Sequence, residues 1–447
     1  MPFKAAALLL FLWVGVASVT ATAKGSRLLQ NNYDYCQAPL PQYVPLPQEV
    51  VRGRSAELLH VQLITRHGDR SPANILPHED VEWNCDTTGL VALDGVLGPP
   101  PGGSLTGSTY IKNINLVSNL PFSQGMWSGN CSAGQLTSEG AMQHYVMGKR
   151  LRQIYITQLG FLPSQYNASQ VFVRSTDVWR TEQSAQANLL GLYPPDTRTS
   201  TSRDSSGIPI YVRPNPVENM VENPTLCPRV AAILNNKTQS DEWLAHQKAM
   251  NNIRLKCNKV CDTGDLASWN NAWDHFSDNF HCRTCHKKPL PCKQGLCITS
   301  SDAEQIFKEA SWERDFLYQT DRELMRIAIG EFVGELLSLM NRTANGDATV
   351  PKYAFFSGHD TTISYLLGAF RQDTKEEIRW PPYASNIIFE LWRVQNDSLY
   401  VRWIYNGQVL PIRGCGASDE LCPWSQFLSH TLKETVLDHS NYRQLCF

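Results

Sequence analysis

The clearest deficit of this 447-residue sequence is net charge: 40 Lys and Arg stand against 42 Asp and Glu, a formal balance of −2. So little excess charge excludes a polybasic protein built to coat nucleic acid or anionic lipid. The sequence also lacks internal repeats and, beyond its first residues, any apolar run long enough to cross a bilayer. Wholesale disorder is excluded, because 42% of the residues are hydrophobic and 10% are aromatic. We therefore expect a globular chain with no nucleic-acid partner.

The N-terminus has the pattern of a secretory signal peptide. Lys4 precedes an apolar run over residues 5–19, and the small residues Ala21 and Ala23 predict cleavage after residue 23. A retained signal anchor is the alternative, although the run is short for a span. Cleavage would leave no stable transmembrane segment. We expect a secreted or lysosomal/endosomal protein, with the Golgi lumen as a further compartment of the same pathway.

Cysteines and glycosylation sequons agree with secretion. Thirteen Cys suit an oxidising lumen, and their odd number leaves at least one thiol unpaired if all the others pair. Five N-x-S/T sequons predict glycosylation. They lie at Asn130, Asn167, Asn236, Asn341 and Asn396.

Strand and helix patterns alternate along most of the chain, which favours an α/β fold. The strands are expected at 59–65, 170–173, 353–356, 387–391 and 399–404. Helices are expected at 138–155, 177–192 and 361–370, and a longer helical region at 301–340. Residues 77–134 are rich in Gly, Pro and Ser and indicate a long loop region. Residues 215–297 carry most of the clustered cysteines and no clear strand.

Three polar clusters follow predicted strands directly. They are the segments 66–72 (RHGDRSP), 174–177 (RSTD) and 357–362 (SGHDTT). In α/β sheets, ligands bind outside the carboxyl ends of the strands. Three such turns side by side would form one pocket.

The first two clusters supply cations and a nucleophile. Arg66, Arg70 and Arg174 carry guanidinium groups that match the oxygen geometry of phosphate or carboxylate. His67 lies between two of them, and an imidazole is a competent nucleophile toward phosphorus. Neighbouring arginines favour its neutral form. A lone Arg or His is usually a surface or structural residue, but the combined R-H-G-x-R-x-P string after a strand is far more specific.

The third cluster adds a proton donor. His359 can hold another oxygen, and Asp360 is a carboxyl group placed to protonate a leaving alcohol. Arginines can carry the charge of the transition state, so the chemistry requires no metal and no cofactor.

Several motifs together resemble the histidine acid phosphatase family, branch 2 of the histidine phosphatase superfamily. They are RHGDRSP at 66–72, LTSEGAMQH at 136–144, VRSTDVWRT at 173–181, the HD pair at 359–360, PPYAS at 381–385 and the pair Cys415/Cys422. The resemblance covers about residues 58–447 and is weakest at 74–130 and 215–299. Within the family, residues 280–297 are similar to the 2-phosphoxylose phosphatase branch.

The resemblance implies a role for each residue of the pocket. His67 would take the phosphoryl group, Asp360 would donate the proton, and water would then attack the phosphohistidine. The oxygens of the phosphate would be held by Arg66, Arg70, Arg174 and His359. Trp179 departs from close relatives, which often carry Asp there, and this departure bears on leaving-group specificity.

The resemblance also implies an organisation of the chain. A doubly wound, mostly parallel sheet flanked by helices would form the catalytic domain from residues 55–75, 136–214 and 300–447. Residues 76–135 and 215–299 would be cap and loop insertions, the cap mainly helical and rich in disulfides. Residues 24–54 would be an extended lead-in.

The cysteine cluster can be interpreted in two ways. Its residues are His281, Cys282, Cys285, His286, Cys292 and Cys297, and their spacing also suits zinc. In a secreted chain disulfides are the better interpretation. Cys415 and Cys422 can close a local loop.

The preferred function is a metal-independent acid phosphatase that hydrolyses phosphate monoesters, small or macromolecular, through a phosphohistidine. Acid conditions help because Asp360 must carry a proton when the ester bond breaks. The alternatives are a 2-phosphoxylose phosphatase-like enzyme of the secretory pathway, a phosphoglycerate-mutase-type transferase, and a non-catalytic glycoprotein or zinc-binding module on the same fold.

Overall fold

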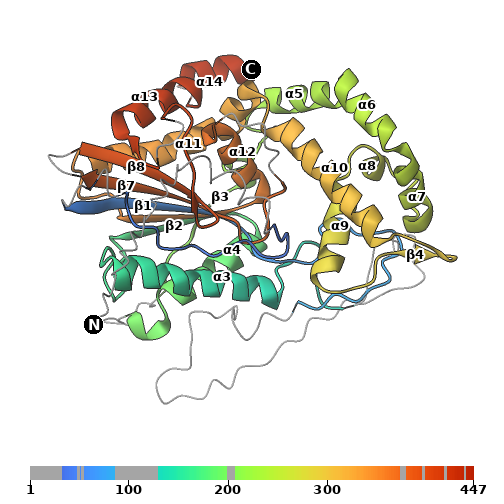
Figure 1. The fold of residues 1–447 in the computed structure, drawn as a ribbon, viewed down its shortest axis with the longest axis horizontal. Coiled ribbons are helices and arrows are strands. Elements are labelled where there is room, and N and C mark those ends of the chain that lie inside the picture. The colour runs from blue at the N-terminus through green and yellow to red at the C-terminus, as the bar shows by residue number, and fades with distance from the viewer. Residues whose placement is uncertain are drawn as a thin grey trace, which may run out of the picture. The chain divides into compact units, whose positions relative to one another are not determined.

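A mixed eight-stranded sheet organises the protein, in the order β10-β8-β7-β1-β6-β2-β3 with β9 beside β8 (Figure 1). Its strands are β1 (Ala56–Arg66), β2 (Val171–Thr176), β3 (Tyr211–Arg213), β6 (Tyr353–Gly358), β7 (Asn386–Val394), β8 (Ser398–Tyr405), β9 (Gln408–Val409) and β10 (Cys422–Pro423). The strands β1, β6, β2 and β3 are parallel to one another, whereas β7 runs antiparallel to both β1 and β8. The predicted α/β sheet with flanking helices is confirmed, with an antiparallel half beside the parallel one.

This computed structural model describes residues 33–47, 51, 55–85, 129–198, 207–372, 379–394, 398–416, 420–436 and 439–447. Residues 34–447 group into one unit by their contacts. The predicted signal peptide and the sequon at Asn396 lie outside the described residues. In the described ranges no helix is both long and apolar enough to cross a membrane.

Helices cover both faces of the sheet (Figure 1). On one face lie α3 (Ser138–Leu151), which continues as a π-helix over Arg152–Gln158, and α4 (Trp179–Leu192). On the other lie α11 (Arg322–Ala344), α12 (Asp360–Phe370) and α13 (Trp424–Glu434). The chain ends in α14 (His439–Cys446), and short 3₁₀ turns occur at Pro195–Thr197 and Asn215–Val217.

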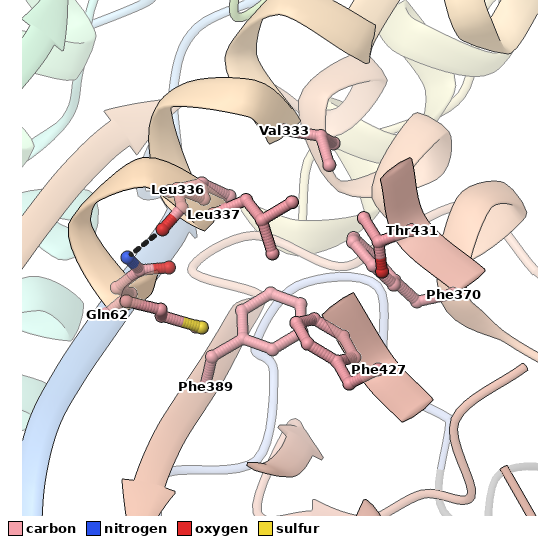
Figure 2. A pocket seen from close by; sticks show the side chains of 9 residues that line it. Gln62, Val333, Leu336, Leu337, Phe370, Phe389, Phe427 and Thr431 are labelled. Atoms are coloured by element: carbon pink, nitrogen blue, oxygen red, sulfur yellow. Dashed lines mark hydrogen bonds between the residues drawn. The ribbon is translucent and has the colours of Figure 1, made fainter. Parts of the chain in front are cut away.

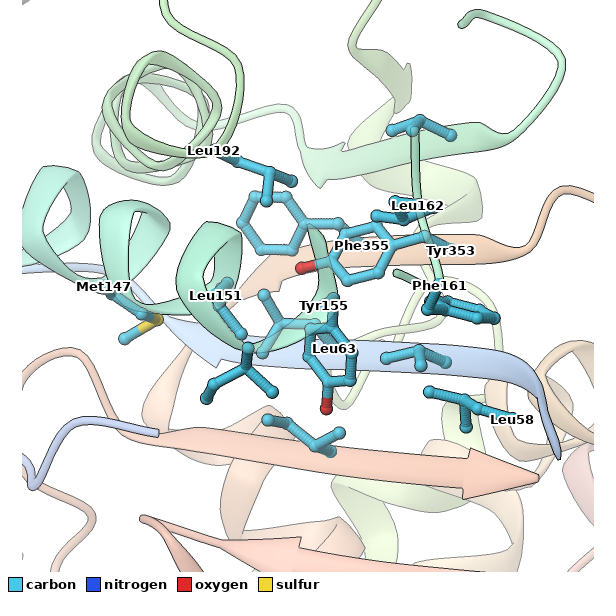
Figure 3. Close-up of a cluster of buried hydrophobic side chains, with 14 of the residues drawn as sticks. Leu58, Leu63, Met147, Leu151, Tyr155, Phe161, Leu162, Leu192, Tyr353 and Phe355 are labelled. Atoms are coloured by element: carbon cyan, nitrogen blue, oxygen red, sulfur yellow. The ribbon is translucent and has the colours of Figure 1, made fainter. Parts of the chain in front are cut away.

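Both faces of the sheet centre are filled by side chains. Against α3, Leu63 of β1 packs with Leu151, Tyr155 and Phe355 (Figure 3). On the opposite face a small apolar cavity is lined mainly by leucine and phenylalanine side chains (Figure 2). The one amide in that lining, Gln62, donates to the carbonyl of Leu336 at 2.7 Å. The middle of the sheet is therefore core, which leaves the strand ends for chemistry.

The predicted mainly helical insertion is present as five helices and a hairpin. They are α5 (Pro228–Thr238), α6 (Asp241–Ala249), α7 (Asn251–Cys261), α8 (Ala267–Asn270), α9 (Asp274–Cys285), and the pair β4 (Cys292–Lys293) and β5 (Leu296–Cys297). The helical region expected at 301–340 consists of two helices, because α10 (Ser300–Tyr318) ends before Asp321 caps α11. Asp321 accepts the N–H of Leu324, which starts a new helix. The domain boundaries themselves stay predictions.

Five disulfides use ten of the thirteen cysteines. They are Cys36–Cys285, Cys85–Cys131, Cys227–Cys446, Cys292–Cys297 and Cys415–Cys422. Cys257, Cys261 and Cys282 are buried free thiols, so the disulfide candidate Cys282 is wrong. Cys285 bonds to Cys36 across 249 residues, a pairing that no local spacing could predict. The zinc interpretation of the cluster is not favoured, because Cys285, Cys292 and Cys297 are bonded in disulfides. Among the described residues there is no group of three or more His, Cys, Asp or Glu that could hold a metal.

The sequons that the structure describes differ in exposure. Asn167 and Asn236 are exposed, Asn341 is half-buried, and Asn130 is half-buried with its Oδ1 accepting the N–H of Cys85 at 2.6 Å. All remain predicted glycosylation sites.

Candidate active site

The three predicted polar clusters lie side by side at the carboxyl ends of neighbouring strands. In the sheet, Arg66 of β1 is paired with Gly358 of β6, and Ser175 of β2 with Ser357. The N–H of His67 donates to the carbonyl of Gly358 at 3.0 Å, just past these strand ends. The expected juxtaposition of residues from three distant parts of the chain is therefore present.

The turn after β1 is packed so closely against the start of α3 that neither of the two glycines at the contact could carry a side chain. A Cβ atom on Gly68 would lie 2.2 Å from the carbonyl oxygen of Gly140, and one on Gly140 would lie 2.1 Å from that of Asp69. Gln143 accepts the N–H of Asp69 at 2.8 Å, and His144 Nε2 lies 3.0 Å from the carbonyl oxygen of Arg66. The LTSEGAMQH segment thus supports the turn that carries His67.

His67 is held as a neutral ring with one nitrogen free. Its Nδ1 lies 2.8 Å from the carbonyl oxygen of Gly68. A carbonyl can only accept, so the proton is on Nδ1 and the lone pair is on Nε2. Burial lowers the pKa of His67 well below its usual value, and Arg180, Arg66 and Arg70 lower it further. A neutral imidazole with a free Nε2 is the form that attacks phosphorus.

Two arginines of the motif are fixed beside this ring. Arg66 donates to Tyr35 Oη at 2.9 Å and lies 4.4 Å from the ring centre of Tyr383. Arg70 forms an ion pair with Asp278 of α9 at 2.7 Å. Both guanidinium groups are buried, so their positions are set before any anion arrives.

Arg180, which the sequence analysis did not single out, is the third cation of the site. It lies in the first turn of α4, with Nη2 3.4 Å from His359 Nδ1. After burial, it is the strongest influence that lowers the pKa of His67. The sequence signal for Arg180 was present in the RSTDVWRT segment. Arg180 is its second arginine and lies on the helix that follows the strand.

Arg174 is not directed at His67, which corrects its predicted assignment to the phosphate site. Its guanidinium donates to Glu218 at 2.5 Å, Asn219 at 2.8 Å and Glu335 of α11 at 2.8 Å. Side chains alternate along a strand, and Val173 packs into the core on the other face. Arg174 therefore points toward α11 and forms a structural ion pair.

His359 links the third cluster to the second. Its Nε2 lies 2.9 Å from Thr176 Oγ1, and its ring centre lies 5.8 Å from that of His67. Burial and then Arg180 lower the pKa of His359 to about 3. Arg180 can donate to the neutral ring, which leaves Nε2–H to donate to Thr176.

Asp360 is a carboxylate with several donors around it. Trp380 Nε1 donates to its Oδ2 at 2.8 Å, Arg66 lies 3.3 Å away and Arg314 3.6 Å away. Although burial raises its pKa, Arg314 and then Arg66 lower it more, and the net result is well below the usual range. In the free protein this group is therefore ionised.

Helix α9 of the insertion braces the site from outside the sheet, by contacts that sequence reasoning missed. Asp278 accepts the N–H groups of Ala73 and Asn74 at 2.8 Å. His286 lies 2.7 Å from Asp69 Oδ2, and His281 stacks on Tyr35 with ring centres 3.6 Å apart. Both histidines of the suspected zinc cluster are thus used in packing and hydrogen bonding.

The chain is similar to several known proteins. Residues 57–406 match the family model described as histidine phosphatase superfamily (branch 2). Counting factor 60 of Dictyostelium discoideum is 34% identical over 421 residues, which are 92% of each chain. Mouse lysophosphatidic acid phosphatase type 6 is 27% identical over 91% of each chain. Human lysosomal acid phosphatase is 28% identical over 85% of this chain and 78% of its own.

Solved structures show the same fold at low identity. Hafnia alvei phytase in complex with tartrate superposes with a TM-score of 0.56 at 15% identity, over 85% of this chain and 97% of its own. Bifidobacterium longum multiple inositol polyphosphate phosphatase, in complex with inositol hexasulfate, gives 0.54 at 13% identity over 91% and 99%.

Proposed function

Because this chain belongs to branch 2 of the histidine phosphatase superfamily, we propose that His67 is the nucleophile of its phosphatase reaction. The chain is an acid phosphatase, a phosphoric monoester hydrolase, as several of its relatives are. The observation that carries the proposal is a single one: His67 Nε2 is free while buried Arg66 and Arg70, with Arg180 beside them, hold the ring neutral.

The first half of the reaction transfers the phosphoryl group to the protein. The ester phosphate binds among the guanidinium groups of Arg66, Arg70 and Arg180, which offer paired N–H donors to its oxygens. A bond forms between His67 Nε2 and phosphorus while the bond from phosphorus to the leaving oxygen breaks. Asp360 gives its proton to that oxygen, so the product leaves as an alcohol.

The second half of the reaction removes the phosphoryl group from His67. Asp360, now a carboxylate, accepts a proton from water as the water oxygen attacks the phosphohistidine. The bond between Nε2 and phosphorus breaks, inorganic phosphate leaves, and His67 returns to its neutral form. The arginines stabilise the charge on the phosphoryl oxygens in both halves.

Acid conditions help because of the proton on Asp360. Its carboxylate is stabilised by Arg66 and Arg314 in the free protein. A bound phosphate shares the charge of Arg66 and adds negative charge beside the carboxylate, and both changes raise the pKa of Asp360. A phosphate monoester has its own second pKa at about 6, so more acid conditions supply the substrate with a proton as well.

We expect kcat/KM for p-nitrophenyl phosphate to stay high between about pH 4 and pH 6. Because the pKa of His67 lies well below its usual value, the ring stays neutral to a lower pH than an ordinary histidine, so mild acid does not remove the nucleophile. The profile should fall on the alkaline side, and a chelator should leave it unchanged. Activity that falls between about pH 7 and pH 5, as for an ordinary histidine, would contradict the assignment.

For the natural substrate we propose a phosphate monoester, small or macromolecular, met in the lumen of the secretory pathway. Five disulfides support an oxidising compartment, and the final location proposed is the lysosomal or extracellular space. A substrate panel tests this proposal. Its first arm is lysophosphatidic acid, for which a relative is named, and its second is a phytase substrate, because the similar solved structures include phytases. Phosphoxylose is a third arm, and transfer between phosphoglycerates tests the mutase alternative.

A further inference from the structure

We propose that the lead-in segment 34–39 forms part of the wall of the phosphate site, where Tyr35 positions Arg66 and the disulfide Cys36–Cys285 fixes the place of Tyr35. The inference rests on the proposed function and deepens it. These residues precede the range 57–406 that matches the family model, so membership of the family gives them no role. Tyr35 acts through Arg66 and is therefore a positioning residue.

Two tyrosine rings enclose the guanidinium group of Arg66. Its central carbon lies 5.0 Å from the ring centre of Tyr35 and 4.4 Å from that of Tyr383. The two rings meet edge to face, with their centres 5.0 Å apart. Cation–π attraction at these distances strengthens when the groups are out of water, and all three side chains are buried. The lead-in segment thus supplies one of the two rings that hold this cation.

Main-chain hydrogen bonds hold the segment against the turn over residues 381–385. The N–H of Tyr383 donates to the carbonyl of Tyr35 at 3.0 Å, and the N–H of Ala38 donates to the carbonyl of Tyr383 at 2.9 Å. Gln143 of α3 donates to the carbonyl of Cys36 at 2.7 Å, and its own amide oxygen supports the turn after β1. The backbone of the segment is therefore tied to two of the turns that form the site.

The disulfide ties the same segment to helix α9 of the insertion. Cys36, the neighbour of Tyr35, bonds to Cys285 at the end of α9. One turn earlier on that helix, His281 stacks on the ring of Tyr35 with centres 3.6 Å apart, and it stacks in turn on Phe307 of α10 at 3.5 Å. A covalent bond and a ring stack from one helix therefore hold Tyr35 in place. Without the bond, the contacts alone would have to order the segment.

Tyr35 sets how Arg66 is shared between the phosphate and the proton donor. Nη2 of Arg66 donates to Tyr35 Oη at 2.9 Å and lies 3.3 Å from Asp360 Oδ2, while Nη1 donates to the carbonyl of Pro381. Without the Tyr35 hydroxyl, the freed N–H would turn to the carboxylate, because a charged donor left unpaired in a buried site is costly. Arg66 would then pair more closely with Asp360 and hold an anion less well.

The first test is inhibition by inorganic phosphate at pH 5, measured on the hydrolysis of p-nitrophenyl phosphate. Tyr35→Phe keeps the ring but loses the acceptor, and we expect the inhibition constant of phosphate to rise about fivefold. Tyr35→Leu also removes the ring, and a rise of about 30-fold is expected. In both variants kcat should change by less than about threefold, because the group that forms the covalent bond is untouched.

A pH profile separates positioning from packing. Closer pairing with Arg66 lowers the pKa of Asp360, so its proton is lost at a lower pH. The alkoxide that leaves glycerol phosphate needs that proton, and the alkaline fall of kcat/KM should move down by about half a pH unit in Tyr35→Phe. A variant that only loosened the fold would leave the profile where it is.

The disulfide is tested by the double variant Cys36→Ser/Cys285→Ser, in which the inhibition constant of phosphate should rise as it does in the Tyr35 variants. The matched control is Cys227→Ser/Cys446→Ser, which removes a bond of similar sequence separation, 219 against 249 residues, between α5 and α14. We expect this control to lower the midpoint of thermal unfolding and to leave the inhibition constant unchanged.

A second control is a buried tyrosine outside the site. Tyr155 donates to Glu390 at 2.7 Å in the core of the sheet. Tyr155→Phe removes a hydroxyl that also bonds a charged group, so it should cost stability while phosphate inhibition stays within about twofold. Circular dichroism must show that each variant is folded, and Tyr35→Phe, the mildest change, decides the question if Tyr35→Leu does not fold.

An unchanged inhibition constant in folded Tyr35→Phe and Tyr35→Leu would overturn the role of Tyr35, and an unchanged one in Cys36→Ser/Cys285→Ser would overturn that of the disulfide. An equal rise in the controls would also overturn the inference, since it would show a general effect of lost packing. Failure of the phosphatase assignment itself would look different, because the unaltered protein would then release no phosphate from p-nitrophenyl phosphate.

Discussion

The His67→Ala variant is expected to lose about 10⁴-fold or more in kcat, since it removes the group that forms the covalent bond. The arginines would still bind phosphate, so KM should change much less than kcat. The ring packs in a buried site, and the variant must therefore be shown to fold, by its thermal unfolding and its circular dichroism. Hydrolysis of p-nitrophenyl phosphate is the measurement.

A control histidine separates this loss from a general effect of removing an imidazole. The pKa of His246 is lowered too, to about 4, but this residue lies on α6 of the insertion and stacks on Trp312 of α10 at 3.9 Å. The His246→Ala variant should keep activity within about twofold. A folded His67→Ala protein with full activity would refute the assignment of the nucleophile.

The second large effect distinguishes Arg180 from Arg174. Removing one donor from a preorganised anion site costs about 10²–10³-fold in rate, which we expect of Arg180→Ala in kcat/KM. Loss of this cation should also raise the pKa of His67, so activity should decline at a higher pH on the acid side. The comparison uses kcat/KM across the pH range.

Arg174→Ala should instead lower stability. It would leave Glu218 buried without its partner, and breaking a buried ion pair in this way costs about 3–5 kcal/mol. We expect a clear fall in the midpoint of unfolding, with kcat/KM of the folded fraction close to normal. The reverse pattern, a stable Arg174→Ala with lost activity beside an active Arg180→Ala, would contradict the placement of both residues.

Much of this site could be predicted because its residues are local to strand ends. The RHGDRSP and HD segments each follow an apolar strand directly, and the edge at which parallel strands end is shared. The strand over 353–356 and the helix after it have strong periodic patterns, and the structure has both, as β6 and α12. For such segments, the position of a residue directly after a strand in the sequence is enough to place it at the end of that strand in the fold.

The rest of the site could not be predicted from the sequence, because it depends on side-chain direction and on contacts between distant segments. Choosing Arg180 over Arg174 required knowing which face of β2 Arg174 points to, and the sequence alone does not show that direction. Asp278 reaches Arg70 from 208 positions away in the numbering, from an insertion without strand patterns. The pairing of Cys36 with Cys285 depends on the same packing of α9, which no spacing rule includes.

The most direct test of the account is to trap the covalent intermediate. The enzyme would be mixed with a phosphate monoester, quenched in base within the time of a turnover, digested and examined by mass spectrometry. The account predicts phosphate on the peptide that contains His67, with the bond stable in base and labile in acid, and none in His67→Ala. Phosphate on another residue, or an active enzyme that carries none at any time during turnover, would contradict it.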